Sequence, residues 1–517
     1  MTMEEEVETR RFSSGASTPL QSQSFQNLRT STLLPRSISS ARISALMMTP
    51  EALAKNGIIP PPSTQSSLRL DEKFSAGYFA LSKTHQSPEA GAVVDDELVN
   101  KIAEILERQD FLMHLARAWH AFGAPVHRME TNLMEVARYL RIDACFFTVP
   151  GLTLISFGDT ATHSSETHIV RATDGYDMSR LEQANQVSKQ VRKGRATVHE
   201  SLRKIEALMA APAHQFPWYV RILVCFLQSF CVSATLFHGS WREALLAGAL
   251  GLLVGISELL GATHPTLGYL LTVIPPAIVS LVATLVSDYV CFAAVPLAAT
   301  INLLPGLSLA LAMLELSSSN IICGAVRLIA ATMASFVIGW SISIGRSLGV
   351  AARGWDQQSQ TTSVFSTCSG LSLWWWILLV PISSIGFNIW FKVHWKRWPA
   401  TIAAAGIGLA IQTSCDRVAV LRPISAGIAA FAVGGFSAIC GRVLKSSSSA
   451  DIVFVGIIQL VPGSTGVRSF VSLLSEELSA SSLTMSMLST SISIAVGLLL
   501  SNGAMYSELR RFKLGSF

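Results

Sequence analysis

The sequence predicts an α-helical polytopic membrane protein with about ten transmembrane helices in two inverted five-helix repeats, preceded by a small cytosolic α/β domain and a disordered tail. Of its 517 residues, 50% are hydrophobic and 14% are charged, and the mean hydropathy is +0.44. Soluble proteins usually carry about 25% charged residues. Beyond Pro217 the chain consists of apolar stretches long enough to cross a bilayer core of about 30 Å. The net charge of +5 is modest and gives no reason to expect nucleic acid binding.

Residues 1–94 form a low-complexity segment that is rich in Ser, Thr, Gln and Arg. A segment of this composition has too few apolar side chains to offset the entropy that is lost when a chain becomes ordered. The sequence therefore predicts a disordered tail over this range.

Residues 95–216 are predicted to form the small cytosolic α/β domain. An amphipathic helix begins at Asp95, where acidic residues suit the positive end of the helix dipole, and a second helix begins at Pro125. The stretch "ACFFTVPGLTLISFG" indicates two strands joined by a Pro-Gly turn, and "ETHIVRAT" indicates a third strand. Two further helices, Met178–Lys193 and Val198–Met209, complete the domain just before the membrane.

The rest of the chain is predicted to hold the two inverted membrane repeats. The first repeat covers residues 217–345, an extracytosolic linker covers 346–370, and the second repeat covers 371–517. The ten candidate spans are Trp218–Phe237, Glu243–Leu260, Leu267–Ser287, Val290–Leu304, Asn320–Gly345, Leu371–Phe391, Trp398–Cys415, Leu421–Gly441, Ile452–Leu474 and Leu483–Ser501. With the α/β domain in the cytosol, the cytosolic connections carry more Lys and Arg than the opposite ones, as the positive-inside rule requires. We therefore expect an integral membrane protein with both termini cytosolic, in a membrane that the sequence does not specify.

Two Pro-Gly pairs interrupt apolar runs at equivalent places in the predicted repeats. Pro305-Gly306 follows the fourth span of the first repeat, and Pro462-Gly463 lies within the fourth span of the second. Proline removes a helical hydrogen bond, and backbone freed in this way inside a membrane must be buried in protein or line a wet cavity. One Pro-Gly pair alone is more often a packing kink. Interrupted segments at matching positions of two inverted halves, however, indicate the central site of a transporter.

Polar residues near these interruptions form the candidate site. The predicted substrate-binding residues are Asn302, Pro305, Gly306, Arg327, Gln459, Pro462, Gly463 and Arg468. An arginine here is suited to hold a substrate carboxylate through two parallel hydrogen bonds. Glu315 and Glu258 are the candidates for carrying a coupling proton, because burial favours the protonated carboxyl group; Glu258 also suits an ordinary interfacial position. We expect the two Pro-Gly pairs to meet at the centre of the membrane part, with both arginines and Glu315 around one cavity.

The eight cysteines show no CxxC spacing. Five of them lie inside apolar runs, where a thiol packs like a small hydrophobic group: Cys225, Cys231, Cys291, Cys323 and Cys440. We therefore expect no disulfide framework, no metal site and no cofactor.

Three stretches resemble the threonine/serine exporter family, including its fungal members. They are "HRMETNLMEVARYLRIDACFFTVPGLTLISF", "NLLPGLSLALAMLELSSSNIICGAVRL" and "IQLVPGSTGVRSF". The resemblance implies a secondary carrier, driven by the proton gradient, that exports threonine and serine or dicarboxylates such as succinate. Its partners would be this substrate, protons and the lipid bilayer, and a homo-oligomer is compatible with it. Matching motif positions are Arg128, Glu130, Pro305, Gly306, Gly324, Arg327, Pro462, Gly463 and Arg468.

Two other functions compete with transport. The first is a membrane-anchored hydrolase built on polar residues of the α/β domain, for which the candidates are His127, Glu130, Ser156, Asp159, His163 and His168. These residues form no nucleophile elbow, HExxH or metal-ligand spacing. The second is a regulatory membrane protein without transport activity. Against both stands the second interrupted helix, which a simple membrane anchor does not need.

Overall fold

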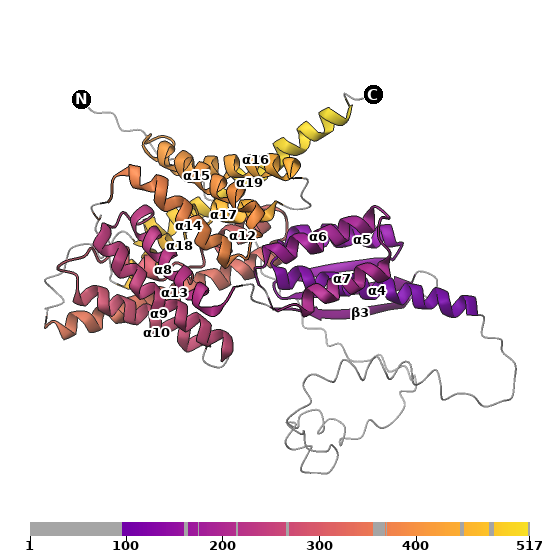
Figure 1. Cartoon of the computed structure of the whole chain (residues 1–517), viewed down its shortest axis with the longest axis horizontal. Helices are drawn as coiled ribbons and strands as arrows, with labels where there is room; N and C mark the ends of the chain where they lie inside the picture. Colours follow the sequence, from indigo (N-terminus) through magenta and orange to yellow (C-terminus); the bar gives the residue numbers. More distant parts are fainter. Residues whose placement is uncertain are drawn as a thin grey trace, which may run out of the picture. The chain divides into compact units, whose positions relative to one another are not determined.

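The computed structural model of the protein describes residues 96–159, 164–173, 175–212, 216–264, 268–354, 368, 370–444, 449–474 and 480–514. This part of the chain is mostly helical and has one small sheet near its N-terminal end (Figure 1). The predicted disordered tail over residues 1–94 lies outside the described residues.

The N-terminal α/β unit, which we call the N-domain, combines helices with one sheet. Its elements are α4 (Asp96–Phe122), α5 (Val126–Leu140), β1 (Ala144–Val149), β2 (Leu152–Asp159), β3 (Ser164–Arg171), α6 (Met178–Arg192) and α7 (Val198–Ala210). The three strands pair antiparallel in the order β1-β2-β3, and Gly151 has a φ of 76° in the tight turn between β1 and β2. The hairpin and the third strand predicted from the sequence are thereby confirmed.

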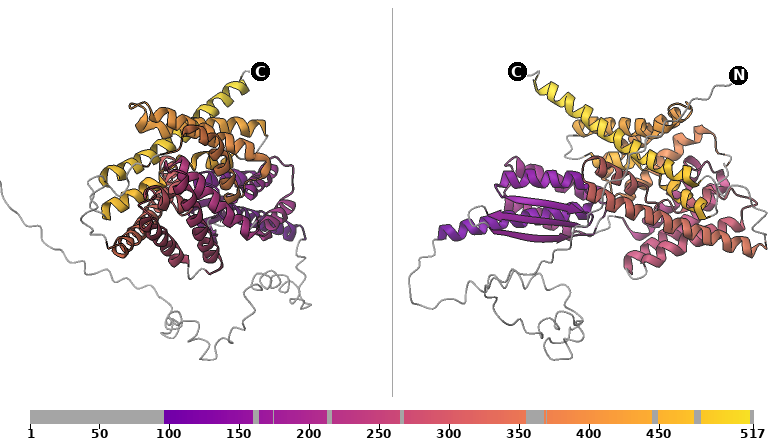
Figure 2. Two further views of the ribbon diagram at one scale, coloured as in Figure 1. Left: turned by 60° about the vertical axis from the view of Figure 1, so that its left-hand side comes forward. Right: turned by 180° about the vertical axis from the view of Figure 1, so that it is seen from behind.

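The N-domain helices cover one face of this sheet (Figure 2). Phe146 on β1 and Ile155 on β2 are buried against them, whereas Phe147 and Ile169 on the other face are exposed. This alternation along a strand is the pattern of a sheet with one covered face. The largest buried side chain of the domain, Trp119, comes from α4.

Beyond the N-domain the chain forms a bundle of apolar helices. They are α8 (Trp218–Thr235), α9 (Trp241–Thr263), α10 (Gly268–Leu285), α11 (Ala294–Ala299), α12 (Gly306–Ser317), α13 (Ile321–Ala352), α14 (Trp376–Trp390), α15 (Trp398–Asp416), α16 (Ser425–Val443), α17 (Ala450–Ile457), α18 (Gly463–Leu474) and α19 (Ala480–Leu514). Within the described ranges, six segments are long and apolar enough to cross a membrane, namely α8, α9, α13, Leu373–Trp390, Arg422–Val443 and Thr484–Met505. The protein is therefore an integral membrane protein.

The ninth predicted span is divided into two short helices, and the fourth predicted span holds one short helix that is followed by a second one beyond Pro305. α11 ends at Ala299 and α12 begins at Gly306, while α17 ends at Ile457 and α18 begins at Gly463. Each new helix thus starts at the glycine of a Pro-Gly pair. The sequence predicted an interruption at each Pro-Gly pair, and the structure confirms both breaks; the preceding helix ends several residues before the proline in each case.

Small residues bring two pairs of helices into close parallel contact. Ser280 on α10 donates a hydrogen bond to the Ile342 carbonyl of α13 at 2.6 Å, and a Cβ on Gly345 would lie 2.0 Å from the carbonyl oxygen of Ala277. In the second half, a Cβ on Gly497 of α19 would lie 2.2 Å from the carbonyl oxygen of Gly427 on α16. Side chains larger than hydrogen would separate these backbones, which is why small residues favour membrane helix packing.

α8 and α14 lie side by side and run in opposite directions. His238, just after α8, stacks on Trp376 at the start of α14, with ring centroids 6.2 Å apart. Near the middle of both helices, a Cβ on Gly386 would lie 2.6 Å from Cγ of Gln228. The end of α14, in turn, lines a cavity together with Arg221 at the start of α8. This end of the two helices is the one next to the N-domain.

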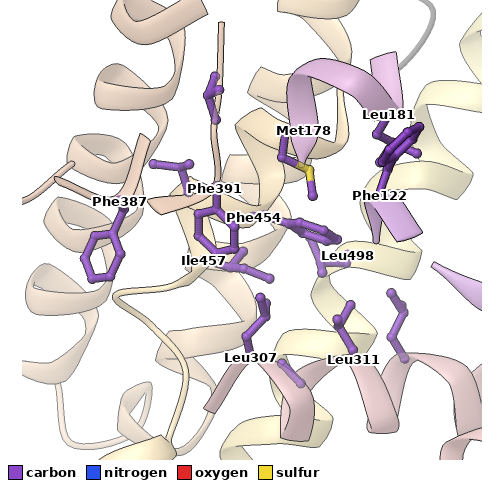
Figure 3. Packing of buried hydrophobic residues seen from close by; sticks show 14 of the residues in the cluster. Phe122, Met178, Leu181, Leu307, Leu311, Phe387, Phe391, Phe454, Ile457 and Leu498 are labelled. Carbon is purple, nitrogen blue, oxygen red and sulfur yellow. The ribbon is translucent and has the colours of Figure 1, made fainter. Parts of the chain in front are cut away.

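The N-domain is joined to the bundle through the start of α6. The backbone N–H groups of Met178 and Ser179 donate to the carbonyls of Phe391 and Lys392, at 3.0 and 3.2 Å. Tyr176 packs edge-on against Phe391 and Phe454, with centroids 5.7 and 6.3 Å apart. Figure 3 shows how this apolar packing continues from the N-domain residues Phe122, Met178 and Leu181 to Leu307, Leu311 and Leu498 in the bundle.

A disulfide joins Cys291 to Cys368, with the two Cα atoms 5.8 Å apart. The expectation of no disulfide was therefore wrong. The two cysteines are 77 residues apart, and no local sequence spacing indicates that they pair. Cys291 also donates its N–H to Glu243 at the start of α9, so the bond lies at the end of α8 that is remote from the N-domain. α13 continues to Ala352, into the range 346–370 that was predicted as a linker.

The disulfide predicts the thiol content of the purified protein. Of the eight cysteines, six are free and two are joined in the described structure. Alkylation with iodoacetamide in denaturant should therefore modify six cysteines before reduction and eight after it, as read by intact mass. Peptide mapping should place the two protected thiols at Cys291 and Cys368, and eight modified cysteines without reduction would contradict the bond.

Candidate functional site

The two Pro-Gly pairs meet backbone to backbone. A Cβ built on Gly306 would lie 3.0 Å from Cα of Gly463, and one built on Gly463 would lie 2.9 Å from Cα of Gly306. The second contact is closer than real Cβ atoms approach and the first is at that limit, so any side chain larger than hydrogen at either position would push the two backbones apart. The structure thus brings Pro305, Gly306, Pro462 and Gly463 together, as the matching positions in the sequence predict.

This contact places the N-termini of two half-helices at one point. Pro305 precedes α12, and the first helical bonds run from Leu309 N–H to Pro305 O and from Gly466 N–H to Pro462 O, at 3.0 and 3.1 Å. The backbone N–H groups before these bonds have no partner within their own helix. Helix N-termini also carry a partial positive charge. Two of them facing each other form an environment suited to an anion such as a carboxylate.

An amide side chain stands three residues before each proline. Asn302 Nδ2 donates to Cys225 Sγ on α8 at 3.4 Å, and Gln459 Nε2 donates to Ser383 Oγ on α14 at 3.0 Å. The two amides therefore make the same kind of contact, each to the first membrane helix of its own half. Both belong to the predicted binding residues.

Two further amides lie at the same level and were missed by the sequence reasoning. Gln228 on α8 and Asn388 on α14 are both 0% exposed, and none of their side-chain N and O atoms has a hydrogen-bond partner among the described residues. They lie one helical turn from Cys225 and Ser384, respectively. Buried polar groups are nearly always bonded in native proteins. The only signal in the sequence was an isolated amide within an apolar run.

Glu315 and Arg327 are paired with each other. Arg327 Nε donates to Glu315 Oε2 at 3.0 Å, Cys323 Sγ lies 3.2 Å from the same oxygen, and Glu315 is only 1% exposed. Close approach of α12 and α13 is possible because a Cβ on Gly324 would lie 2.8 Å from Leu316 N. The pair sits nine residues along α12 from Gly306, which is about 14 Å of helix.

Arg468 and Glu258 lie on opposite sides of the helix breaks. Arg468 is five residues along α18 from Gly463, about 7.5 Å of helix, and its guanidinium stands 5.5 Å from the ring centroid of Phe237 beyond α8. Glu258 lines a cavity of about 170 Å³ that also contacts Arg221, Lys392 and Cys225. Cys225 both lines this cavity and accepts the hydrogen bond from Asn302, and so it connects the cavity to the first helix break.

The two N-domain motif residues have different surroundings. Glu130 Oε1 accepts a hydrogen bond from Thr148 N–H at 2.8 Å and so ties α5 to β1. Burial raises the pKa of Glu130, and the bond from Thr148 opposes that rise. Arg128 lines two cavities between the N-domain and the bundle.

Among the proposed hydrolase residues whose side chains the structure describes, Ser156 and His168 do not come together. Ser156 Oγ accepts a hydrogen bond from Thr167 at 3.1 Å, whereas His168 is opposite Ile155 and therefore lies on the other face of the sheet. His163 and the side chain of His127 lie outside the described residues. In the described part of the chain, no three His, Cys, Asp or Glu side chains come together as metal ligands.

Two family models match the chain. "Putative threonine/serine exporter" matches residues 110–349, and "Threonine/Serine exporter, ThrE" matches residues 376–503. No solved structure matches.

Curated relatives come from fungi. Pheromone-regulated membrane protein 10 of Candida albicans is 30% identical over 380 residues, covering 72% of this chain and 34% of the relative. An uncharacterized Schizosaccharomyces pombe protein is 28% identical, covering 73% and 50%, and pheromone-regulated membrane protein 10 of Debaryomyces hansenii is 29% identical, covering 80% and 42%. The chain thus spans a third to a half of the length of these relatives.

The contact between Gly306 and Gly463 predicts that alanine destabilises the protein at Gly306 but not at a glycine with free space around it. Gly306→Ala forces a methyl group against the backbone of Gly463 and should destabilise the protein by about 1–3 kcal/mol. Gly406 on α15 has no atom within 4 Å of the position that a methyl group would take, so Gly406→Ala is the matched control and should be neutral or stabilising by about 0.5–1 kcal/mol. Thermal unfolding in detergent measures both, and equal midpoints for the two variants would contradict the contact.

Proposed function

We propose that the chain, which belongs to the threonine/serine exporter family, is a secondary active transporter that exports small polar metabolites in a proton-coupled cycle. The substrates we expect are threonine- or serine-like amino acids or small carboxylates. The observation that carries this proposal is the meeting of two half-helix N-termini, at Gly306 and Gly463, inside the helix bundle. A membrane anchor or an enzyme tether gains nothing from two helices broken at one point.

Two inverted halves, α8–α13 and α14–α19, account for this arrangement. Each half has a broken fourth segment, and the sequences at the breaks, "NLLPG" and "QLVPG", place an amide three residues before proline. Each half also packs its third and last segments in parallel, α10 with α13 and α16 with α19. The first helices, α8 and α14, run in opposite directions. A pseudo-two-fold axis in the membrane plane relates such halves in many transporters.

The site we propose for the substrate lies between the two breaks. The N–H groups at the starts of α12 and α18 would hold the substrate carboxylate. Asn302, Gln459, Gln228 and Asn388 would then offer amide groups to the hydroxyl and amino groups of the substrate. Binding there would also satisfy the amides of Gln228 and Asn388, which are otherwise buried without partners among the described residues. Arg468 lies closer than the breaks to the end of the bundle that is remote from the N-domain. There it would attract the anionic substrate as it enters or leaves.

For proton coupling we propose Glu315 and Glu258. Protonation of Glu315 would remove its charge and weaken its bond to Arg327, which would then be free to move or to pair with a substrate carboxylate. Glu258 would exchange protons with the N-domain side, because Arg221 at the start of α8 lines the same cavity. Protonation of either glutamate changes which charged groups are paired. A proton can therefore favour one conformation of the carrier over another, as coupling requires.

We also propose that the N-domain and both termini are cytosolic. The Lys and Arg content of the connections supports this orientation. The Cys291–Cys368 disulfide supports it as well, because the bond is at the end of α8 remote from the N-domain, and disulfides persist in oxidising compartments rather than in the cytosol.

The central amide gives a direct test of the substrate site. Gln459→Leu removes the bond to Ser383 and should lower transport by about three- to tenfold, the value of one net hydrogen bond. Gln412 on α15 provides the control variant Gln412→Leu. The measurement is uptake of labelled threonine, serine and succinate into proteoliposomes under an imposed pH gradient. Absence of transport of all three by the unchanged protein would remove the proposal.

The ion pair gives a test of coupling. Glu315→Gln cannot lose a proton, so transport by this variant should no longer respond to the pH gradient, while substrate-induced thermal stabilisation should persist. The control is Glu200→Gln on exposed α7, which should keep the gradient dependence. A Glu315→Gln variant that still accumulates substrate against a gradient as the unchanged protein does would exclude Glu315 as the coupling group.

A further inference from the structure

A polar cavity of about 410 Å³ lies between the N-domain and the start of α17. Its wall is formed by α4, α5 and α6 on one side and by Ser449 and Ala450 on the other. It is separate from the helix breaks and from the cavity of Glu258. Neither the transport site nor the coupling residues use it.

The lining of this cavity is cationic. Arg128, Lys189 and Arg192 contribute three positive charges, and no carboxylate is among the lining residues that the structure describes. Arg192 pairs with Glu135. Arg128 has no ion-pair partner within the described residues; its side chain is solvent-accessible, yet the protein around it still lowers its pKa through desolvation. A partly desolvated guanidinium without a counter-charge is stabilised by any anion that reaches it.

Two buried donors in the same lining also lack partners. Trp119 Nε1 and Ser188 Oγ belong to residues that are 1% and 2% exposed, and neither atom has a hydrogen-bond partner among the described residues. Leaving such a group unsatisfied is unfavourable, because its desolvation is not offset by a hydrogen bond. An indole N–H can only donate. The group that satisfies it must therefore be an acceptor, as an anionic oxygen is.

We infer that this cavity binds a small anionic metabolite through its carboxylate or phosphate oxygens. Arg128 and Lys189 would balance the charge, Trp119 and Ser188 would donate to the oxygens, and the amides of Asn132 and Asn185 would complete the shell. This site is distinct from the transport site and would remain if the transport proposal failed. Its position makes it regulatory.

The regulatory path runs through α17. Arg128 and Ala450 also line a second, apolar cavity that reaches Leu311 on α12 and Phe454 on α17. An anion that holds Arg128 against Ala450 therefore contacts the N-domain and the half-helix that leads to Pro462. If the anion fits only one distance between the N-domain and α17, its binding shifts the population towards the conformation that has this distance.

The test uses the purified full-length chain in detergent at constant ionic strength. Succinate, citrate and inorganic phosphate are titrated separately by calorimetry, with chloride as the reference anion. At least one of the three should bind saturably, and the ranking separates a carboxylate ligand from a phosphate ligand. No saturable binding of any of them would overturn the inference.

Variants then locate the binding. Arg128→Gln should weaken it at least tenfold, and Ser188→Ala, which keeps every charge, should weaken it about threefold or more. Arg203→Gln on α7 removes an exposed cation outside the cavity and should leave the affinity unchanged. Thermal midpoints confirm that each variant is folded. Equal affinity in Arg128→Gln and Ser188→Ala relative to the unchanged chain would assign the binding elsewhere and overturn the inference.

Discussion

The contact between Gly306 and Gly463 is the constraint on which the bundle depends. Two backbones approach so closely there that a side chain on either residue would push them apart. Each Pro-Gly pair follows the end of one helix by several residues and each glycine starts the next helix, so the freed backbone groups are placed together in protein rather than in lipid. The amides of Asn302 and Gln459 are then fixed beside the breaks by their bonds to α8 and α14. The rest of the bundle encloses this point.

The N-domain is linked to that centre by charge as well as by apolar packing. Arg397, just before α15, contacts Glu182 of the N-domain at 3.7 Å and Asp451 of α17 at 2.7 Å. Asp177 caps α6 through Arg180 N–H and pairs with Lys392. Thus the first half of the second broken helix shares its partners with the N-domain. A shift of the N-domain and a shift of α17 are therefore energetically linked.

Local patterns in the sequence predicted local features well. The Pro-Gly turn between β1 and β2 and the two helix breaks were each evident from a few neighbouring residues. The bond between Glu315 and Arg327 was not, because it depends on α12 and α13 folding back on each other at Gly324. Partners brought together by tertiary packing also escaped detection, as the amides of Gln228 and Asn388 and the disulfide illustrate. Sequence periodicity describes one helix at a time and carries no information about which helices become neighbours.

The disulfide between Cys291 and Cys368 has a mechanical consequence. The two cysteines flank α11, α12 and α13, so these helices form a covalently closed loop of chain whose ends are fastened together on one side of the bundle. Segments held at one end can still swing at the other. In any rearrangement of this half, we therefore expect the helix ends near the disulfide to stay close together and the ends beside the N-domain to move furthest.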